Sequence, residues 1–70
     1  METAKKIRMI MLERGVNVKE LAELIGTSSS NLSNKLSRNN FKEEDLRIIA
    51  NALNCEYDSV FTYRDTGKQI

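Results

Sequence analysis

The sequence predicts an all-α domain, a compact bundle of four to five helices that ends in a short C-terminal tail or hairpin. The chain has 70 residues, which is enough for one small core. Apolar residues make up 40% of it and aromatic residues only 6%, a balance that suits close helix packing better than a sheet sandwich. Apolar residues also recur at helical spacing in successive segments that end at a glycine or a polar turn.

The first helix is predicted for residues 3–14. Ile7, Ile10 and Met11 fall at i, i+3 and i+4, and Gly15 follows in the position of a C-cap. Met9 and Leu12 lie off this stripe. The helix is therefore more apolar than one buried face requires, and it could offer a second contact surface.

The second helix is predicted for residues 18–25. Asn17 is a suitable N-cap, and Glu20 stands where the partner in a capping box is found. Gly26 can end the helix because it tolerates a left-handed conformation. The predicted buried face consists of Leu21, Ala22 and Ile25.

The third helix is predicted for about residues 28–37, with Ser28 as its cap. Leu32 and Leu36, four residues apart, are its only apolar side chains and should both face the core. The rest of the helix is serine, asparagine and basic residues. Such a polar face is either a solvated surface or a surface that reads a polar partner.

The fourth helix is predicted after the loop "RNNF", from which Phe41 should plug the core. It begins with the acidic residues 43–45, which favour a helix N-terminus through the helix dipole. Its predicted core face consists of Leu46, Ile49, Ala50 and Leu53.

The segment "NCEYDSVF" is predicted as a turn and a short fifth helix that carries Val60 and Phe61 onto the core. The tail beyond it contains the turn-like tripeptide Asp65-Thr66-Gly67 between short β-leaning segments. A small hairpin, an exchanged strand and a disordered tail all fit this pattern.

Composition favours some classes of function over others. The single cysteine, Cys55, and the lack of histidine leave no internal disulfide and no expected zinc, other metal or cofactor site. An enzyme is not expected, since the chain offers few groups for acid–base or nucleophilic catalysis. The apolar run near the N-terminus is interrupted by Arg8 and is too short for a signal peptide or membrane span, so a cytoplasmic protein is expected.

The net charge of +1 divides unevenly along the chain. Residues 1–38 carry a formal charge of +3 and residues 39–70 carry −2. This asymmetry permits an anionic partner on the N-terminal half but is also common on ordinary protein surfaces.

The segment "LAELIGTSSSNLSNKL" meets the requirements of a helix-turn-helix. Such a motif needs a small residue where the two helices touch, a glycine in the turn and an apolar residue on the second helix. Ala22, Gly26 and Leu32 occupy these places. Together with "LRIIANALN" and "DSVF" downstream, the segment resembles the Cro/repressor-type helix-turn-helix family, whose fold is the lambda-repressor-like bundle of four or five helices. The resemblance covers about residues 4–61.

This resemblance implies a DNA-binding domain in residues 1–61, with residues 62–70 as a tail that forms a strand or a dimer contact. The third helix would lie in the major groove of double-stranded DNA. Ser29, Ser30 and Asn34 match the family's base-facing positions, and Ser33 and Lys35 lie close enough to contribute to base contacts. The positions implied to contact phosphates are Asn17, Lys19, Ser28, Arg38, Asn39, Asn40 and Lys42.

The chain departs from the family pattern at two positions. Val18 stands where the family usually has a glutamine that binds phosphate, so that contact is absent or comes from Lys19. Lys35 stands where the family usually places its next buried residue on the third helix, and Leu36 takes that role instead. These departures bear on which side chains of the third helix face the bases.

The function expected from the sequence is sequence-specific DNA binding by a small phage-type or bacterial transcriptional regulator, located in the cytoplasm at the nucleoid. It would act as a homodimer, assembled only on DNA, through the fifth helix and the tail from Thr62 to Ile70. The alternative is a protein-interaction module, an antitoxin or anti-regulator, that uses a patch formed by Met9, Leu12 and Ile48.

Overall fold

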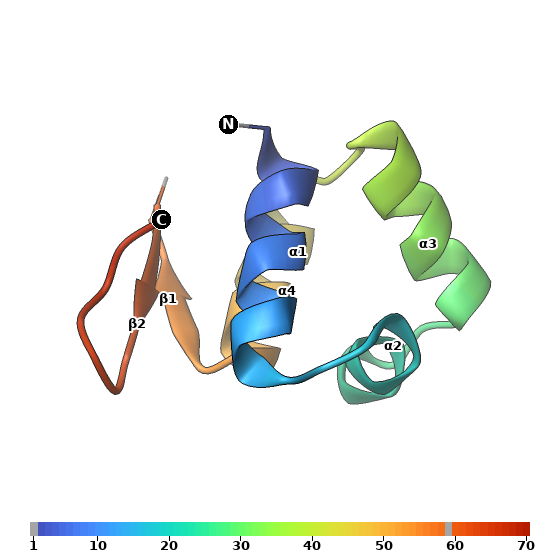
Figure 1. Cartoon of the computed structure of the whole chain (residues 1–70). Coiled ribbons are helices and arrows are strands. Elements are labelled where there is room, and N and C mark those ends of the chain that lie inside the picture. The colour runs from blue at the N-terminus through green and yellow to red at the C-terminus, as the bar shows by residue number, and fades with distance from the viewer. Residues whose placement is uncertain (1, 59) are drawn as a thin grey trace.

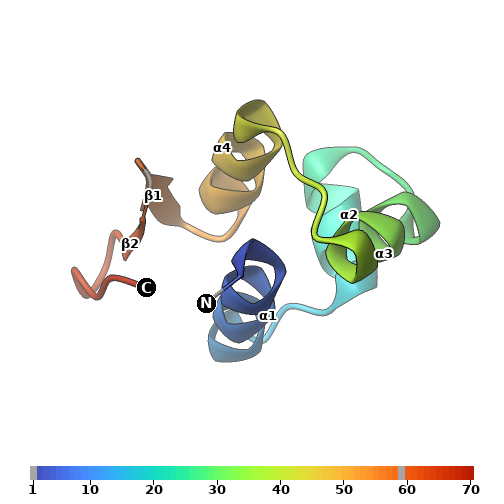
Figure 2. The same cartoon turned by 90° about the horizontal axis from the view of Figure 1, so that it is seen from above.

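The computed structural model describes residues 2–58 and 60–70 of the chain. The described part folds into four helices and one antiparallel pair of strands. Helices α1 and α4 occupy the middle of the molecule, with α2 and α3 on one side and the strand pair on the other (Figures 1 and 2). The elements are α1 Thr3–Arg14, α2 Val18–Ile25, α3 Ser29–Arg38, α4 Glu43–Ala52, β1 Cys55–Tyr57 and β2 Phe61–Tyr63.

The first two helices have the bounds that their caps predict. Gly15 and Gly26 both adopt the left-handed conformation, with φ of 69° and 76°, immediately after α1 and α2. The Asn17 side chain accepts a hydrogen bond from the backbone N–H of Glu20, and the Glu20 carboxylate accepts one from the backbone N–H of Asn17. The predicted capping box is therefore confirmed, with Asn in the place more often taken by Ser or Thr.

Ser28 is the N-cap of α3, as predicted, and accepts a hydrogen bond from the backbone N–H of Asn31, so the helix itself runs from Ser29 to Arg38. It ends at Asn39, which adopts the left-handed conformation with φ of 51°. The Asn39 side-chain oxygen also accepts a hydrogen bond of 2.8 Å from the backbone N–H of Ala4. One residue thus ends α3 and caps the start of α1, which lies 35 positions away in the sequence.

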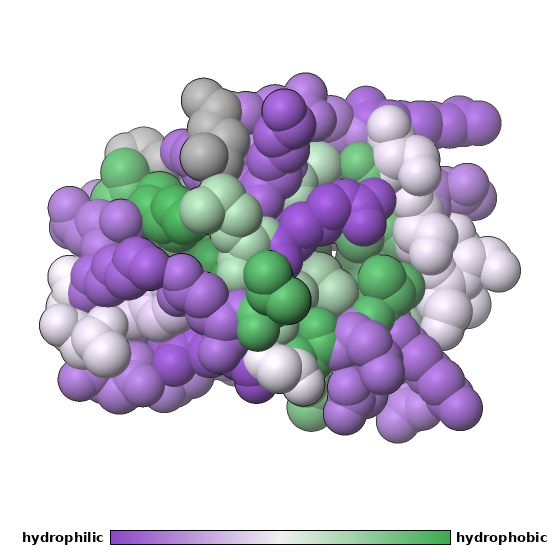
Figure 3. Space-filling model, viewed as in Figure 1, coloured by the Kyte–Doolittle hydropathy of each residue, from purple (hydrophilic) through white to green (hydrophobic). Residues whose placement is uncertain are grey.

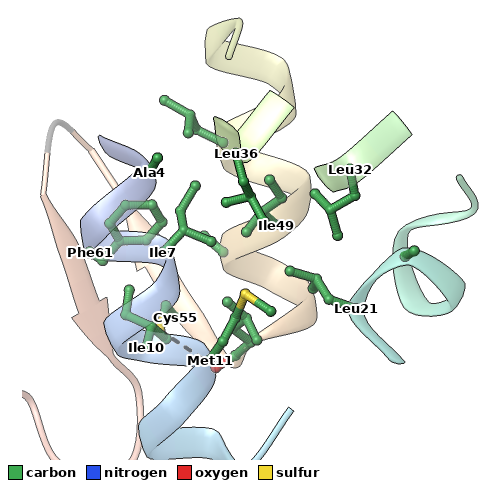
Figure 4. Close-up of a cluster of buried hydrophobic side chains, with 14 of the residues drawn as sticks. Ala4, Ile7, Ile10, Met11, Leu21, Leu32, Leu36, Ile49, Cys55 and Phe61 are labelled. Atoms are coloured by element: carbon green, nitrogen blue, oxygen red, sulfur yellow. Dashed lines mark hydrogen bonds between the residues drawn. The ribbon is translucent and has the colours of Figure 1, made fainter. Parts of the chain in front are cut away.

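The core lies between the four helices and the strand pair. Ile7 and Met11 from α1 meet Leu21, Leu32 and Ile49 from the other three helices (Figure 4). The predicted face of α4 is buried, and Leu32 and Leu36 of α3 are both buried as expected. Ile25 and Phe41 are half-buried and pack against this core.

The predicted fifth helix is wrong. Residues 55–57 form β1, which pairs antiparallel with β2 in a register that sets Cys55 opposite Tyr63. The chain leaves α4 through Asn54, whose φ of 56° is left-handed, and the residues that follow are aromatic, apolar and polar in an alternation typical of strands. Phe61 is buried as predicted, but Val60 is exposed, contrary to expectation.

The tail pairs with β2 within the same chain. Phe61 and Ile70 exchange two backbone hydrogen bonds of 3.1 and 3.0 Å, and Thr62 bridges to Gln69. A turn at Gly67, with φ of 76°, reverses the chain between them. Among the alternatives left open by the sequence, the structure takes the hairpin. The predicted boundary between a domain of residues 1–61 and a tail of residues 62–70 falls inside strand β2.

Candidate nucleic-acid interface

The outward face of α3 is a row of polar side chains. With about 100° of rotation per residue, the two buried leucines Leu32 and Leu36 define the inward direction, and Asn34 lies opposite to them. Ser30 and Arg38 flank Asn34 at i−4 and i+4, and all three are exposed. Figure 3 shows a pale, weakly polar surface where α3 lies, with both strongly hydrophilic and apolar surface beside it.

The predicted base-contacting residues do not all share this row. Ser29 and Ser33 are exposed but lie on the flank of α3, nearer to the inward direction than Asn34. Asn31 and Ser37 were not predicted, although both are exposed and lie beside the row. The spacing from the two leucines was the signal that could have found them.

Lys35 does not extend from the outward face. Its ammonium group forms an ion pair of 2.9 Å with the Asp45 carboxylate of α4, and its side chain is 32% exposed. The same carboxylate oxygen accepts a hydrogen bond from the backbone N–H of Lys42, at 3.0 Å. The hydrogen bond from Lys42 is the larger cause that lowers the pKa of Asp45 below its usual value, and the ion pair with Lys35 is the second cause.

The start of α2 presents the backbone N–H groups of Val18 and Lys19, which have no acceptor within the helix. Lys19 is exposed beside them, and Asn17 is exposed at the cap. The Glu20 carboxylate, however, lies at the same helix start in the capping box. A phosphate that approaches these N–H groups therefore meets one favourable cation and one unfavourable carboxylate.

A polar hollow of about 270 Å³ lies along α3 toward its C-terminal end. Arg38, Asn40 and Lys42 are all exposed in this region. Asn39 is exposed too, but its side-chain oxygen already caps α1, so only its amide group remains to donate. The hollow is lined by Asn31, Asn34, Lys35, Arg38 and Asn40.

The hydroxyl of Ser28 likewise has a structural role, since it accepts a hydrogen bond from the backbone N–H of Asn31 at 3.1 Å. The Asn31 side chain donates to the Thr27 hydroxyl at 2.8 Å. The turn between α2 and α3 is thus held by side-chain hydrogen bonds, and the first turn of α3 is fixed in place relative to α2.

The three apolar residues proposed as a protein-binding patch are exposed but do not line one hollow. Leu12, 84% exposed, lines a shallow hollow beside Val16 and Val18. Ile48, 50% exposed, lines a separate cleft of about 160 Å³ between α2, α3 and α4. Met9 is exposed on α1, and Figure 3 shows apolar surface along this helix.

Cys55 is a buried packing residue. Its thiol donates to the Leu53 carbonyl oxygen at 3.5 Å, and burial raises its pKa, which disfavours the reactive thiolate. In residues 2–58 and 60–70 no group of three or more acidic, cysteine or histidine side chains converges as a metal site would require. No helix of this part of the chain is long and apolar enough to cross a membrane.

Comparison with protein families gives one match. Residues 6–65 match the model of the Cro/C1-type HTH DNA-binding domain. The match begins inside α1 and ends two residues after β2, so it includes the complete α2–turn–α3 unit and the strand pair. Neither the curated proteins nor the solved structures contain a match to this chain.

Proposed function

The chain belongs to the Cro/C1-type helix-turn-helix family of DNA-binding domains, and from this premise we propose that it binds specific sites on double-stranded DNA as a small transcriptional regulator. Helix α3 enters the major groove with Asn34 at the centre of the contact. The observation that supports this most strongly is the exposed row of Ser30, Asn34 and Arg38 opposite the buried leucines.

Base recognition follows from the chemistry of this row. An asparagine amide can donate to and accept from one adenine, whereas a serine hydroxyl pairs with several bases and discriminates less. A face with one or two asparagines among several serines therefore supplies modest direct readout. Sequence-dependent DNA shape and the spacing of two sites supply the remainder of the specificity.

Phosphate contacts come from the rim of α3. Arg38 and Lys42 are exposed at its C-terminal end, and Lys19 is exposed at the start of α2. Each cation that neutralises a phosphate releases counterions and makes binding more dependent on salt. As a DNA-binding regulator, the protein would work in the cytoplasm, at the nucleoid.

The experiment that tests this proposal measures binding to random-sequence duplex DNA by fluorescence anisotropy over a salt series. We expect a steep fall in affinity with salt, and a slope smaller by about 0.9 in the Arg38→Ala variant, the value for one phosphate contact. Arg64→Ala removes an exposed arginine from the turn after β2 instead and should leave the slope close to wild type. A response that is flat at low salt would contradict DNA binding.

We also propose that two copies bind together on DNA, because one small domain buries limited surface against a duplex. Their half-sites would lie about 34 Å apart on one face of the DNA. With no fifth helix among the described residues, the contact between copies would involve the surface of the strand pair and tail. Analytical ultracentrifugation on a palindromic duplex should give cooperative binding of two copies, and strictly independent binding would contradict the pairing.

A second candidate function, binding to another protein, is favoured by the exposure of Leu12. Leu12 lines a shallow hollow with Val16 and Val18, and a contiguous exposed apolar surface of this kind can mark a contact with a partner. The Leu12→Glu variant should lose the partner and keep DNA binding if this function holds. Loss of DNA binding with retention of a protein partner would exclude it.

A further inference from the structure

Asp45 stands at the junction between α3 and α4. Its carboxylate accepts the backbone N–H of Lys42, which fixes the first turn of α4, and it pairs with the Lys35 ammonium group of α3. Its side chain is only 21% exposed, so water screens this pair less than an ion pair at the open surface. One carboxylate therefore fixes the loop between the helices and the direction of a lysine.

The direction of Lys35 is what makes this pair informative. By helical rotation, Lys35 lies about 100° from Asn34, the centre of the outward face. A lysine has four rotatable bonds in its side chain and could reach toward a phosphate beside that face. In the structure its stem lines both the cleft at Ile49 and the polar hollow at Arg38, and its ammonium group pairs with Asp45 instead of extending toward solvent.

We propose that Asp45 is a specificity-determining residue that holds Lys35 away from the DNA backbone. This inference rests on the proposed function, and it adds a restraint on that function. A lysine on phosphate strengthens binding to every duplex equally, because phosphate contacts carry no sequence information. By retaining Lys35, Asp45 lowers affinity for non-specific DNA and leaves discrimination to Asn34 and its neighbours.

The test uses the Asp45→Asn variant, in which an amide oxygen can still accept the Lys42 N–H but the negative charge is lost. Binding to random-sequence duplex DNA is measured across a salt series, as for the wild type. We expect the salt slope to steepen by about 0.9, the value for one added phosphate contact. Glu44→Gln is the matched control, because it removes one negative charge from the adjacent exposed residue of the same helix turn.

A double variant separates the effect of a released Lys35 from the effect of removing the negative charge of Asp45. In Lys35→Met the long apolar stem that lines the cleft is kept and the ammonium group is removed. Adding Asp45→Asn to this background should leave the salt slope unchanged. Circular dichroism melting of each variant verifies that it is folded under the conditions of the titration.

Three results would count against the inference in distinguishable ways. If wild type binds DNA and Asp45→Asn behaves like Glu44→Gln, the inference is overturned and DNA binding stands. If Asp45→Asn steepens the slope equally in the Lys35→Met background, the carboxylate acts by repelling DNA directly and the assigned restraint is wrong. If the wild type does not bind duplex DNA at low salt, the proposed function and the inference fall together.

Discussion

At the scale of single residues, Tyr63 occupies two contrasting environments. The Arg14 guanidinium lies 4.3 Å from the centre of its ring, a cation–π contact. Its hydroxyl oxygen is buried and has no partner in good hydrogen-bonding geometry among the described residues, although the Glu13 carboxylate lies close enough to act on its pKa. Burial, followed by the nearby Glu13 carboxylate, raises the pKa of Tyr63, so the phenol stays neutral.

A buried hydroxyl without a partner is destabilising, because it has lost its hydrogen bonds to water. The Tyr63→Phe variant keeps the ring and the cation–π contact and removes the hydroxyl. We expect its free energy of unfolding to rise by about 1 kcal/mol, as measured by urea denaturation. Tyr57→Phe, at a half-buried ring without this feature, serves as the control. A marked loss of stability in Tyr63→Phe would show that the hydroxyl has a partner in solution.

At the scale of secondary-structure elements, local signals predicted the helices and failed on the strands. The caps at Asn17, Gly15 and Gly26 act within one turn of the helix that each of them bounds, so the observed limits of α1 and α2 could be predicted from local sequence. Strand β2 instead lies between β1 and the tail, and it pairs with both. Each strand has only three residues, which is too short for an alternating pattern to identify the strand or its partner.

Asn39 illustrates the same limit and provides a prediction. Its place in a polar loop was evident from the sequence, but its hydrogen bond to Ala4 was not. Asn39→Ala removes that cap and also the polar side chain that lets asparagine tolerate the left-handed conformation, whereas Asn39→Gly removes the cap and adopts that conformation without strain. We expect unfolding free energies lower by about 2 kcal/mol for Ala and about 1 kcal/mol for Gly.

Asn40→Ala is the control for this comparison, because it lies next in the same exposed loop and a surface substitution there should change stability by less than about 0.5 kcal/mol. Equal losses in the Ala and Gly variants would show that the left-handed conformation imposes no strain. No loss in either variant would show that the cap on α1 contributes nothing to stability.

At the scale of the whole molecule, charged contacts join the first helix to the last residues. Arg14 forms two hydrogen bonds with Asp65, of 2.9 and 3.0 Å, and also donates to the Leu53 carbonyl oxygen. Glu13 pairs with Lys68. Each of these contacts spans at least 39 positions of sequence, so the end of α4 and the turn and tail after β2 are attached to α1 by side chains that no sequence pattern connects.

These contacts predict how stability depends on pH. In the folded protein, the hydrogen bonds from Arg14 are the main cause that lowers the pKa of Asp65. The hydrogen bond from Lys68 is the main cause that lowers the pKa of Glu13. A carboxyl group whose folded pKa lies below its unfolded value stabilises the fold above the unfolded pKa, about 4 for these residues. That contribution is lost as pH falls through the folded pKa.

We therefore expect Asp65→Asn to melt at a lower temperature than wild type at pH 7, and the difference to shrink between pH 7 and pH 2, as protonation of Asp65 in the wild type removes its charge. Glu56→Gln, an exposed carboxylate on β1, should show little difference at either pH. The difference in melting temperature is measured from thermal unfolding curves recorded by circular dichroism at several pH values. A difference that persists unchanged at pH 2 would place the role of Asp65 in packing instead of charge.

The sequence predicted which residues of the candidate interface are exposed, but not which of them have partners on other helices. Ser30, Asn34 and Arg38 follow from counting along α3 from two leucines, and the structure finds all three exposed. Lys35 and Asn39 have partners on α4 and α1, and these partners come from the packing of helices against one another. Whether any of these residues contacts DNA stays a prediction.

The molecule measures 31 Å along its longest dimension and 20 and 18 Å along the others, and the C-terminus lies on the side away from α3 (Figure 1). A dye, an affinity tag or a surface linker attached at Ile70 would thus leave on the far side from a duplex held by α3. Tethering the protein through this residue should present the same helix to solution in every copy. That gives single-molecule recordings of DNA arrival and departure a uniform orientation.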